Sequence, residues 1–223
     1  GTGTPQPVVL TPTEITTLGD GVINVSATTR DSAGNEVTAS PISFSLDTAA
    51  PAAPTLALGS GISDGANSVE AIQAAGVITA SAETGSTLSV VFSRSGGGSV
   101  TRTLTGTGTP QPVVLTPTEI TTLGDGVINV SATTRDSAGN EVTASPISFS
   151  LDTAAPAAPT LALGSGISDG ANSVEAIQAA GVITASAETG STLSVVFSRS
   201  GGGSVTRTLT GTGTPQPVVL TPT

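Results

Sequence analysis

The feature that most constrains the fold is an internal repetition. The segment GTGTPQPVVL begins at Gly1, Gly106 and Gly211, and every residue between these starts recurs at an offset of 105. A unit of this length lies in the common size range of an autonomous domain and exceeds the small solenoid units, which cannot bury a core alone. The 223 residues therefore hold two full periods and 13 further residues, and each repeat is expected to fold by itself.

Short apolar runs fill each repeat, and Gly, Pro, Asn or Asp interrupts them about every ten residues, a pattern typical of β-strands and turns. One weak helical pattern stands at 68–75, where a single helical turn and a loop packed on the sheet edge both remain open, the loop being favoured. Strands are expected at 55–58, 77–82, 88–94, 100–105, 112–115, 127–135 and 147–151. Seven strands predict an all-β fold of tandem immunoglobulin-like β-sandwich domains.

Alternation along three of these strands predicts the core, because successive side chains of a strand point to opposite faces of the sheet. The inward positions are Leu88, Val90 and Phe92, then Ile128, Val130 and Ala132, and last Ile147, Phe149 and Leu151. The opposite positions carry mainly Ser, Thr and Asn, so the outer faces are expected to be polar but almost uncharged.

A proline-containing linker separates one sandwich from the next. It covers 47–54 (DTAAPAAP) and recurs at 152–159, and its prolines favour extended backbone, so the domains are expected to join end to end with little freedom. The predicted domains are 1–47, the C-terminal part of a first repeat; 48–152, a complete repeat; and 153–223, the N-terminal part of a third. Neither flanking part can bury both faces of its core alone, so the ends of neighbouring copies are expected to complete each other.

Side-chain composition excludes several classes of function. Cys, His, Lys, Met, Tyr and Trp are absent, which excludes disulfides, Cys/His metal sites, histidine base catalysis and Schiff-base chemistry. Sixteen acidic residues against six arginines give a net charge of −10, which argues against a nucleic-acid partner because phosphate binding needs clustered cations. No segment holds the ~18 apolar residues of a membrane span, so direct membrane insertion is not expected. Small cations are the natural partners of such a chain.

The acidic side chains fall in expected turns or at strand ends. In an immunoglobulin-like topology, one pole gathers Glu83, Asp136 and Glu141 near the linker residue Asp47, and the other gathers Asp64, Glu70, Glu119 and Asp125 near Asp152. Two like charges ~4 Å apart repel by about 1 kcal/mol in water and by about 4 kcal/mol at an effective dielectric of 20. A cation should therefore neutralise each junction, and ligand sets made only of hard oxygens suit Ca²⁺.

The clearest local motif is DSAGNE, at 31–36 and 136–141. Its alternating oxygens could wrap a cation, yet SAGN is also a good turn; both interpretations remain open, with the metal favoured. At DGAN (64–67) and LGDG (123–126) the plain turn is favoured instead. The candidate metal ligands are Asp31, Asn35, Glu36, Asp47, Asp64, Glu83, Asp125, Asp136, Asn140, Glu141, Asp152, Asp169 and Glu188.

Several segments resemble the bacterial immunoglobulin-like repeats of giant adhesins: DTAAPAAPTL, ITASAETGSTLSV, GVINVSATTRDSAGNEVTAS and SFSLDTAAPAAP. They are similar to the extender regions of RTX adhesins of Gram-negative bacteria, which are exported by type I secretion and include an ice-binding adhesin. The resemblance implies a chain of sandwiches that Ca²⁺ stiffens at the domain junctions. It places calcium ligands on Asp47 and Asp152 in DTAAP, Glu83 and Glu188 in AETGS, and Asp31, Asp136, Asn35 and Asn140 in DSAGN.

The function expected from these features is that of a non-catalytic extender on the bacterial cell surface, with identical neighbouring repeats and calcium ions as its partners. The alternative is a module that recognises a partner, glycan or surface through its polar flank. Such sites usually present exposed aromatic or arginine anchors, and only Arg94 and Arg102 are candidates, interpreted here as solvated strand ends. An enzyme is not expected, because carboxylate pairs of the glycosidase kind lack aromatic platforms for sugars here.

Overall fold

The computed structural model describes residues 3–220, and its contacts divide the chain into two compact units, Gly1–Thr153 and Ala154–Thr223. The first unit begins with α1 (Pro12–Leu18), β1 (Gly21–Val25), β2 (Thr28–Arg30), β3 (Glu36–Thr38) and β4 (Ile42–Leu46). The central repeat follows with β5 (Thr55–Leu58), η1 (Glu70–Ile72), β6 (Ile78–Ser81), β7 (Thr87–Arg94), β8 (Ser99–Thr105), β9 (Gln111–Val113), α2 (Pro117–Leu123), β10 (Gly126–Arg135), β11 (Glu141–Thr143) and β12 (Ile147–Leu151). The second unit holds β13 (Thr160–Leu163), η2 (Glu175–Ile177), β14 (Ile183–Ser186), β15 (Thr192–Ser198), β16 (Ser204–Thr210) and β17 (Gln216–Val218).

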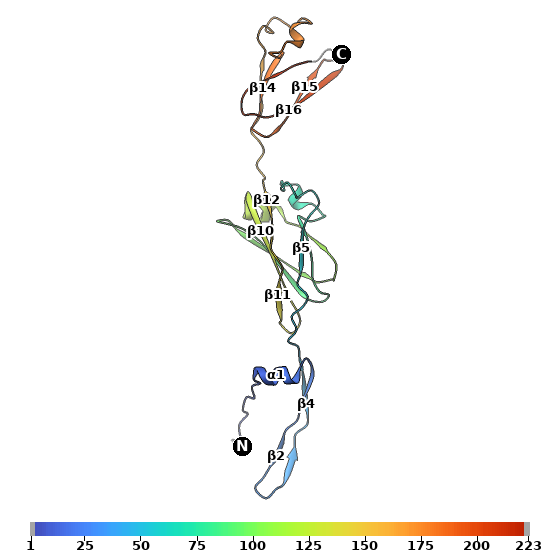
Figure 1. Cartoon of the computed structure of the whole chain (residues 1–223), viewed down its shortest axis with the longest axis vertical. Coiled ribbons are helices and arrows are strands. Elements are labelled where there is room, and N and C mark those ends of the chain that lie inside the picture. The colour runs from blue at the N-terminus through green and yellow to red at the C-terminus, as the bar shows by residue number, and fades with distance from the viewer. Residues whose placement is uncertain (1–2, 221–223) are drawn as a thin grey trace. The chain divides into compact units, whose positions relative to one another are not determined.

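The central repeat is a two-layered β-sandwich. One sheet has the strand order β5-β6-β9, and the other has the order β11-β10-β7-β8, with β12 also paired to β10. All of these ladders are antiparallel. Figure 1 shows β5 in one layer and β10 with β12 in the other. The prediction of an all-β fold built from tandem sandwich domains is confirmed.

Burial alternates along the strands as the sequence pattern predicts. On β7 the positions of Leu88, Val90 and Phe92 are buried, whereas the residues between them are only partly covered. Eight of the nine expected inward side chains belong to one buried cluster, and the ninth, Ile147, is partly buried against it. The core sits between the two sheets and is closed at one end by α2, which buries Ile120 and Leu123.

The last strand of the repeat, β12, lies at the expected residues 147–151, and a further short strand, β11, precedes it. Two short strands, β11 and β12, both pair with β10, and residues 144–146 separate them. Pro146 lies in this interruption, where it has no N–H to give to a ladder. Strand β11 therefore extends the pairing of β10 beyond the expected strand at 147–151.

Two helical elements correct the expectations from sequence. The favoured loop at 68–75 contains a single 3-10 turn at 70–72, so the helical alternative was the right one there. Helix α2 was not predicted at all, although Thr116 and Glu119 form a capping box around a proline at the start of the helix. That TPTE pattern is the sequence signature of a helix start. In the described part of the chain, residues 3–220, no helix is long and apolar enough to cross a membrane.

The flanking parts have the same sequence as the central repeat, but their side chains are less buried. None of the described residues 3–50 is buried, and within 21–46 the ladders are β1 with β4 and β2 with β3. Residues 160–218 form the sheet β13-β14-β17 and the pair β15-β16, with a small core around Leu193, Val195 and Val218. The surroundings of a side chain, and not its local sequence, therefore decide whether it is buried.

The expected linker at 47–54 is shorter in the structure. Pro51 and Pro54 are buried, and the backbone N–H of Ala52 donates a hydrogen bond to Glu83 Oε2 at 2.9 Å. The second half of the proline segment therefore belongs to the central sandwich, and residues 47–50 connect it to β4.

The burial pattern of β10 yields a paired prediction. Ile128 has no exposed surface, whereas its neighbour Val127 is 56 % exposed on the opposite face. Ile128→Ala should lower the free energy of unfolding by about 2–5 kcal/mol because it removes buried methyl groups and leaves a cavity. Val127→Ala, the matched control, should change it by no more than about 0.5 kcal/mol. Denaturant unfolding of both variants measures this, and equal effects would contradict the assigned core face.

Candidate functional site

Three of the predicted ligand residues line one cavity of about 360 Å³. Asp47 directly follows β4, Glu83 lies in the turn after β6, and Asp136 directly follows β10. Residues 49–51, residues 84–86 and Ser137 complete the lining. Asp47 therefore comes from the end of one repeat, while Glu83 and Asp136 belong to the next repeat. We call this cavity, which the three carboxylates line, the junction cavity.

Asp136 is held by the turn that follows it. Its Oδ1 accepts hydrogen bonds from the backbone N–H of Gly139 at 2.7 Å and of Asn140 at 2.9 Å, and its Oδ2 accepts one from Asn140 Nδ2 at 2.8 Å. Gly139 has φ +104°, a conformation that side chains other than hydrogen rarely allow. The DSAGN segment is therefore a turn whose internal hydrogen bonds hold Asp136, as the plain-turn interpretation predicts.

The same motif also contacts the preceding repeat. Asn140 Nδ2 donates a second hydrogen bond, at 3.1 Å, to the backbone carbonyl oxygen of Asp47. The hydrogen bond from the Asn140 side chain lowers the pKa of Asp136 below its ordinary value, and the Asn35 side chain does the same for the pKa of Asp31. Asp136 therefore keeps its negative charge to a lower pH than an ordinary aspartate does.

Glu83 fixes the start of its own sandwich through the bond to Ala52, and the third repeat repeats this contact. There, Glu188 Oε2 accepts a hydrogen bond from the backbone N–H of Ala157 at 3.0 Å. An AETGS glutamate in each unit thus holds the proline segment that precedes the first strand. This role was not foreseen, because the glutamate and the alanine are 31 residues apart in sequence.

At the other pole, aspartates hold the residue that follows each linker aspartate. Asp125 Oδ1 accepts hydrogen bonds from the backbone N–H and the hydroxyl of Thr153, at 2.9 and 2.8 Å. Asp20, the equivalent residue 105 positions earlier, holds Thr48 in the same way at 2.8 Å for both bonds. Asp20 was missing from the predicted ligands, although its identity with Asp125 in the repeat was a sufficient signal.

The remaining predicted ligands lie apart from the junction cavity. Glu141 and Glu36 face Arg135 and Arg30 on neighbouring strands, with Nε–Oε1 distances of 3.7 and 3.6 Å. Asp64 and Asp169 are exposed in turns, and Asp152 donates its backbone N–H to Ala66. Within residues 3–220, no three acidic side chains are close enough together to form a ready metal site.

The donors of the junction cavity nonetheless suit a hard cation in their chemistry. Each is a carboxylate, and a carboxylate offers about four lone-pair positions, of which the hydrogen bonds described above use only a part. Backbone carbonyl groups of the lining can add further oxygen ligands. Oxygen ligands of this kind are the ones that Ca²⁺ accepts in flexible geometry.

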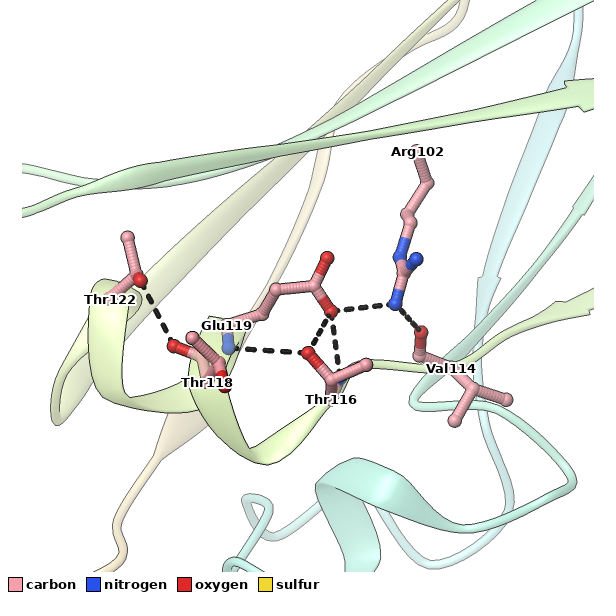
Figure 2. A network of polar contacts seen from close by, with 6 residues as sticks. All are labelled: Arg102, Val114, Thr116, Thr118, Glu119 and Thr122. Atoms are coloured by element: carbon pink, nitrogen blue, oxygen red, sulfur yellow. Dashed lines mark hydrogen bonds and ion pairs between the residues drawn. The ribbon is translucent and has the colours of Figure 1, made fainter.

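A polar network attaches α2 to the sandwich (Figure 2). One guanidinium nitrogen of Arg102, on β8, donates hydrogen bonds to Glu119 Oε2 at 2.6 Å and to the carbonyl oxygen of Val114 at 3.0 Å. The same Oε2 accepts the backbone N–H and the hydroxyl of Thr116, both at 2.7 Å. Burial by itself raises the pKa of Glu119, but the Thr116 hydrogen bonds and the Arg102 charge outweigh it, so this pKa lies below its ordinary value.

These contacts correct the interpretation of two arginines as solvated strand ends. Arg102 holds the start of α2, and Arg94 Nε donates to the carbonyl oxygen of Leu123 at 2.7 Å, at the end of the same helix. Both side chains serve the fold. The exposed anchors that a binding module needs are therefore not supplied by these two residues.

No protein-family model and no curated protein sequence matches the chain. A similar solved structure is the tetra-tandem repeat in the extending region of a large adhesion protein, with 24% sequence identity and a TM-score of 0.38, covering 92% of this chain and 49% of that one. Another is a Ca²⁺-stabilized adhesin that helps an Antarctic bacterium reach out and bind ice, with 24% identity and a TM-score of 0.34, covering 86% and 46%.

The present chain spans about half the length of both structures. The resemblance to extender repeats of large adhesins, stated from the sequence, is confirmed as a resemblance.

The turn around Asp136 yields a pKa prediction with a built-in control. Asn140→Ala removes the side-chain donor to Asp136 Oδ2 and should raise the pKa of Asp136 toward its ordinary value, because the charged form loses a hydrogen bond. Asp31 keeps its own Asn35 and should be unaffected. Carboxyl NMR titration of both residues measures this. Because the folded pKa is depressed, the contribution of this turn to stability is present above the ordinary aspartate pKa and is lost as pH falls through the folded value.

Proposed function

We propose that this chain is a non-catalytic extender of an adhesin on the bacterial cell surface, in which calcium ions stiffen the junctions between identical β-sandwiches. The observation that supports the proposal is the junction cavity, which is lined by one carboxylate from the end of one repeat and two from the next. The chain of sandwiches would project a distal ligand-binding domain away from the cell.

The charge of the junction cavity supports a bound cation. Three carboxylates line it, while the arginine next to Asp136 in sequence, Arg135, faces Glu141 instead. The 3.7 Å pair that these two form is solvent-exposed, and such pairs contribute at most about 1 kcal/mol. With Arg135 directed to Glu141, a divalent ion would supply positive charge among the three cavity carboxylates at one point.

Cation binding here has a mechanical consequence because of where the ligands lie. Asp47 is the first residue of the connecting segment at 47–50, and Glu83 and Asp136 are fixed to the central sandwich by β6 and β10. An ion that binds all three removes rotational freedom from the connecting segment. The Asn140 bond to the Asp47 carbonyl already links the same two repeats, so the ion adds to an existing contact.

Perfect repetition agrees with a role in which length matters and no single repeat is special. A catalytic site or a selective binding surface needs only one copy, whereas reach increases with every copy. The net charge of −10 suits a stalk that stays soluble, because like-charged molecules repel one another.

Calcium removal and carboxylate substitution test the proposal together. Ca²⁺ should raise the melting temperature of the 223-residue chain and increase its largest dimension in small-angle scattering, both reversed by EDTA. At 100 times the dissociation constant, binding stabilises by about 2.7 kcal/mol, which corresponds to a shift on the order of 10 °C for a domain of this size. Glu83→Gln should remove most of the shift, because it keeps a hydrogen-bond acceptor for Ala52 but loses the charge.

Asp64→Asn is the matched control, because Asp64 lies in an exposed turn outside the junction cavity. It should leave the calcium response unchanged. A melting temperature and a length that do not respond to Ca²⁺ or EDTA would contradict the stiffening role, and equal loss in both variants would show that the ion binds elsewhere.

A further inference from the structure

The asparagines of this chain fall into two groups. Four of the six hydrogen-bond within their own turns through their side chains, namely Asn35, Asn67, Asn140 and Asn172. The other two, Asn24 and Asn129, form no side-chain hydrogen bond within residues 3–220. The turns of the repeat therefore explain four asparagines and leave this identical pair without a structural role.

The position of Asn129 is unusual for its residue type. It lies inside the ten-residue strand β10, and its side chain is exposed on the outer face of the sheet. Asparagine is depleted in strands and favours turns, where its side chain can hydrogen-bond to nearby backbone groups. Natural sequences depart from such local preferences mainly at functional sites. The strand position of Asn129 therefore points to a function outside the fold.

The same two asparagines begin a three-residue motif. Residues 24–26 and 129–131 both read Asn-Val-Ser, which matches the acceptor pattern for attachment of a sugar to asparagine: Asn, any residue except Pro, then Ser or Thr. None of the four turn asparagines has a Ser or Thr two residues later. The motif alone is common by chance, but here it coincides with the only asparagines of residues 3–220 whose side chains form no hydrogen bond.

We propose that Asn129, and its equivalent in each repeat, is a modification site that carries a sugar on its side-chain amide nitrogen. The donor is a sugar activated at its anomeric carbon by a phosphate-containing leaving group. The amide nitrogen loses a proton to a base of the transferase and bonds to the anomeric carbon. The bond from that carbon to the phosphate oxygen breaks, and the leaving group keeps the electron pair. Because β10 is held by ladders on both sides in the folded repeat, the transfer precedes its pairing.

The surface around Asn129 has room for a sugar. Its partners across the two ladders are Ser93 on β7 and Ser148 on β12, which both have small side chains. Ser131 and Val127 lie two residues to either side on the same face of the strand, and both are exposed. A sugar is bulky and solubilising. It would cover the apolar surface of Val127 and add a polar group to the side of the sandwich in every period of 105 residues.

The spacing of the arginines allows a direct test by mass spectrometry of the protein isolated from the cells that produce it. Cleavage after arginine yields the peptide 103–135, in which Asn129 is the only asparagine, and the peptide 31–94, which contains two turn asparagines. The first should carry a sugar, and enzymatic hydrolysis of the amide linkage should leave aspartate at 129. The second should have its unmodified mass. Peptide 103–135 found only at its unmodified mass, or with the sugar on a Ser or Thr, would overturn the proposal.

Two substitutions in the 223-residue chain, produced in the same cells, separate the motif from its surroundings. Ser131→Ala keeps Asn129 but removes the hydroxyl of the motif, so peptide 103–135 should lose its sugar. Peptide 1–30 of the same chain has an intact motif at Asn24 and should keep it. Ser148→Ala, the matched control, removes an exposed hydroxyl beside Asn129 and should leave the modification unchanged. A sugar that persists in Ser131→Ala, or an equal loss in both variants, would contradict recognition of this motif.

Discussion

The pairing of β10 with β7 is the interaction on which the rest of the repeat depends. It joins residues 48–125, which supply the sheet β5-β6-β9 and the strands β7 and β8, to the last segment, which supplies β10, β11 and β12. Where the pairing is present, both faces of the core are covered and 21 residues form one buried cluster. Where it is absent, the corresponding residues of 21–46 form two-stranded ladders without a buried side chain, and those of 160–218 keep only a small core.

The same pairing also determines where the turns at one pole of the sandwich lie. Asp136 follows β10 directly, so the ladder with β7 fixes where the DSAGN turn begins and places it beside Glu83. The junction between repeats is thus a consequence of the internal pairing of each repeat. The Asn140 contact with the Asp47 carbonyl and the Glu83 contact with Ala52 show that hydrogen bonds already order the connecting segment at this pole. A cation would add to this arrangement.

Much of the fold could be predicted from the sequence, because alternation along β7, β10 and β12 determines the inward side chains and the period of 105 determines the unit. Helix α2 was not predicted because it carries no long apolar pattern, and its seven residues are specified instead by a capping box. Arg94 and Arg102 were misinterpreted for the same reason, since their partners lie on that helix. Among the acids, nearness to the linker was predictable for Glu83 and Asp136, but the attraction of Glu141 to Arg135 depends on the register of β11, which no sequence pattern reveals.

Comparing the fragment 48–152 with the fragment 48–125 tests the central claim most directly. The first contains both partners of the β10–β7 pairing, and the second lacks β10, β11 and β12. Denaturant unfolding followed by far-ultraviolet circular dichroism should show one cooperative transition for 48–152, at the same midpoint as the main transition of the 223-residue chain, and no cooperative transition for 48–125. A cooperative transition of 48–125 at that same midpoint, or a 48–152 fragment that does not fold, would contradict the account.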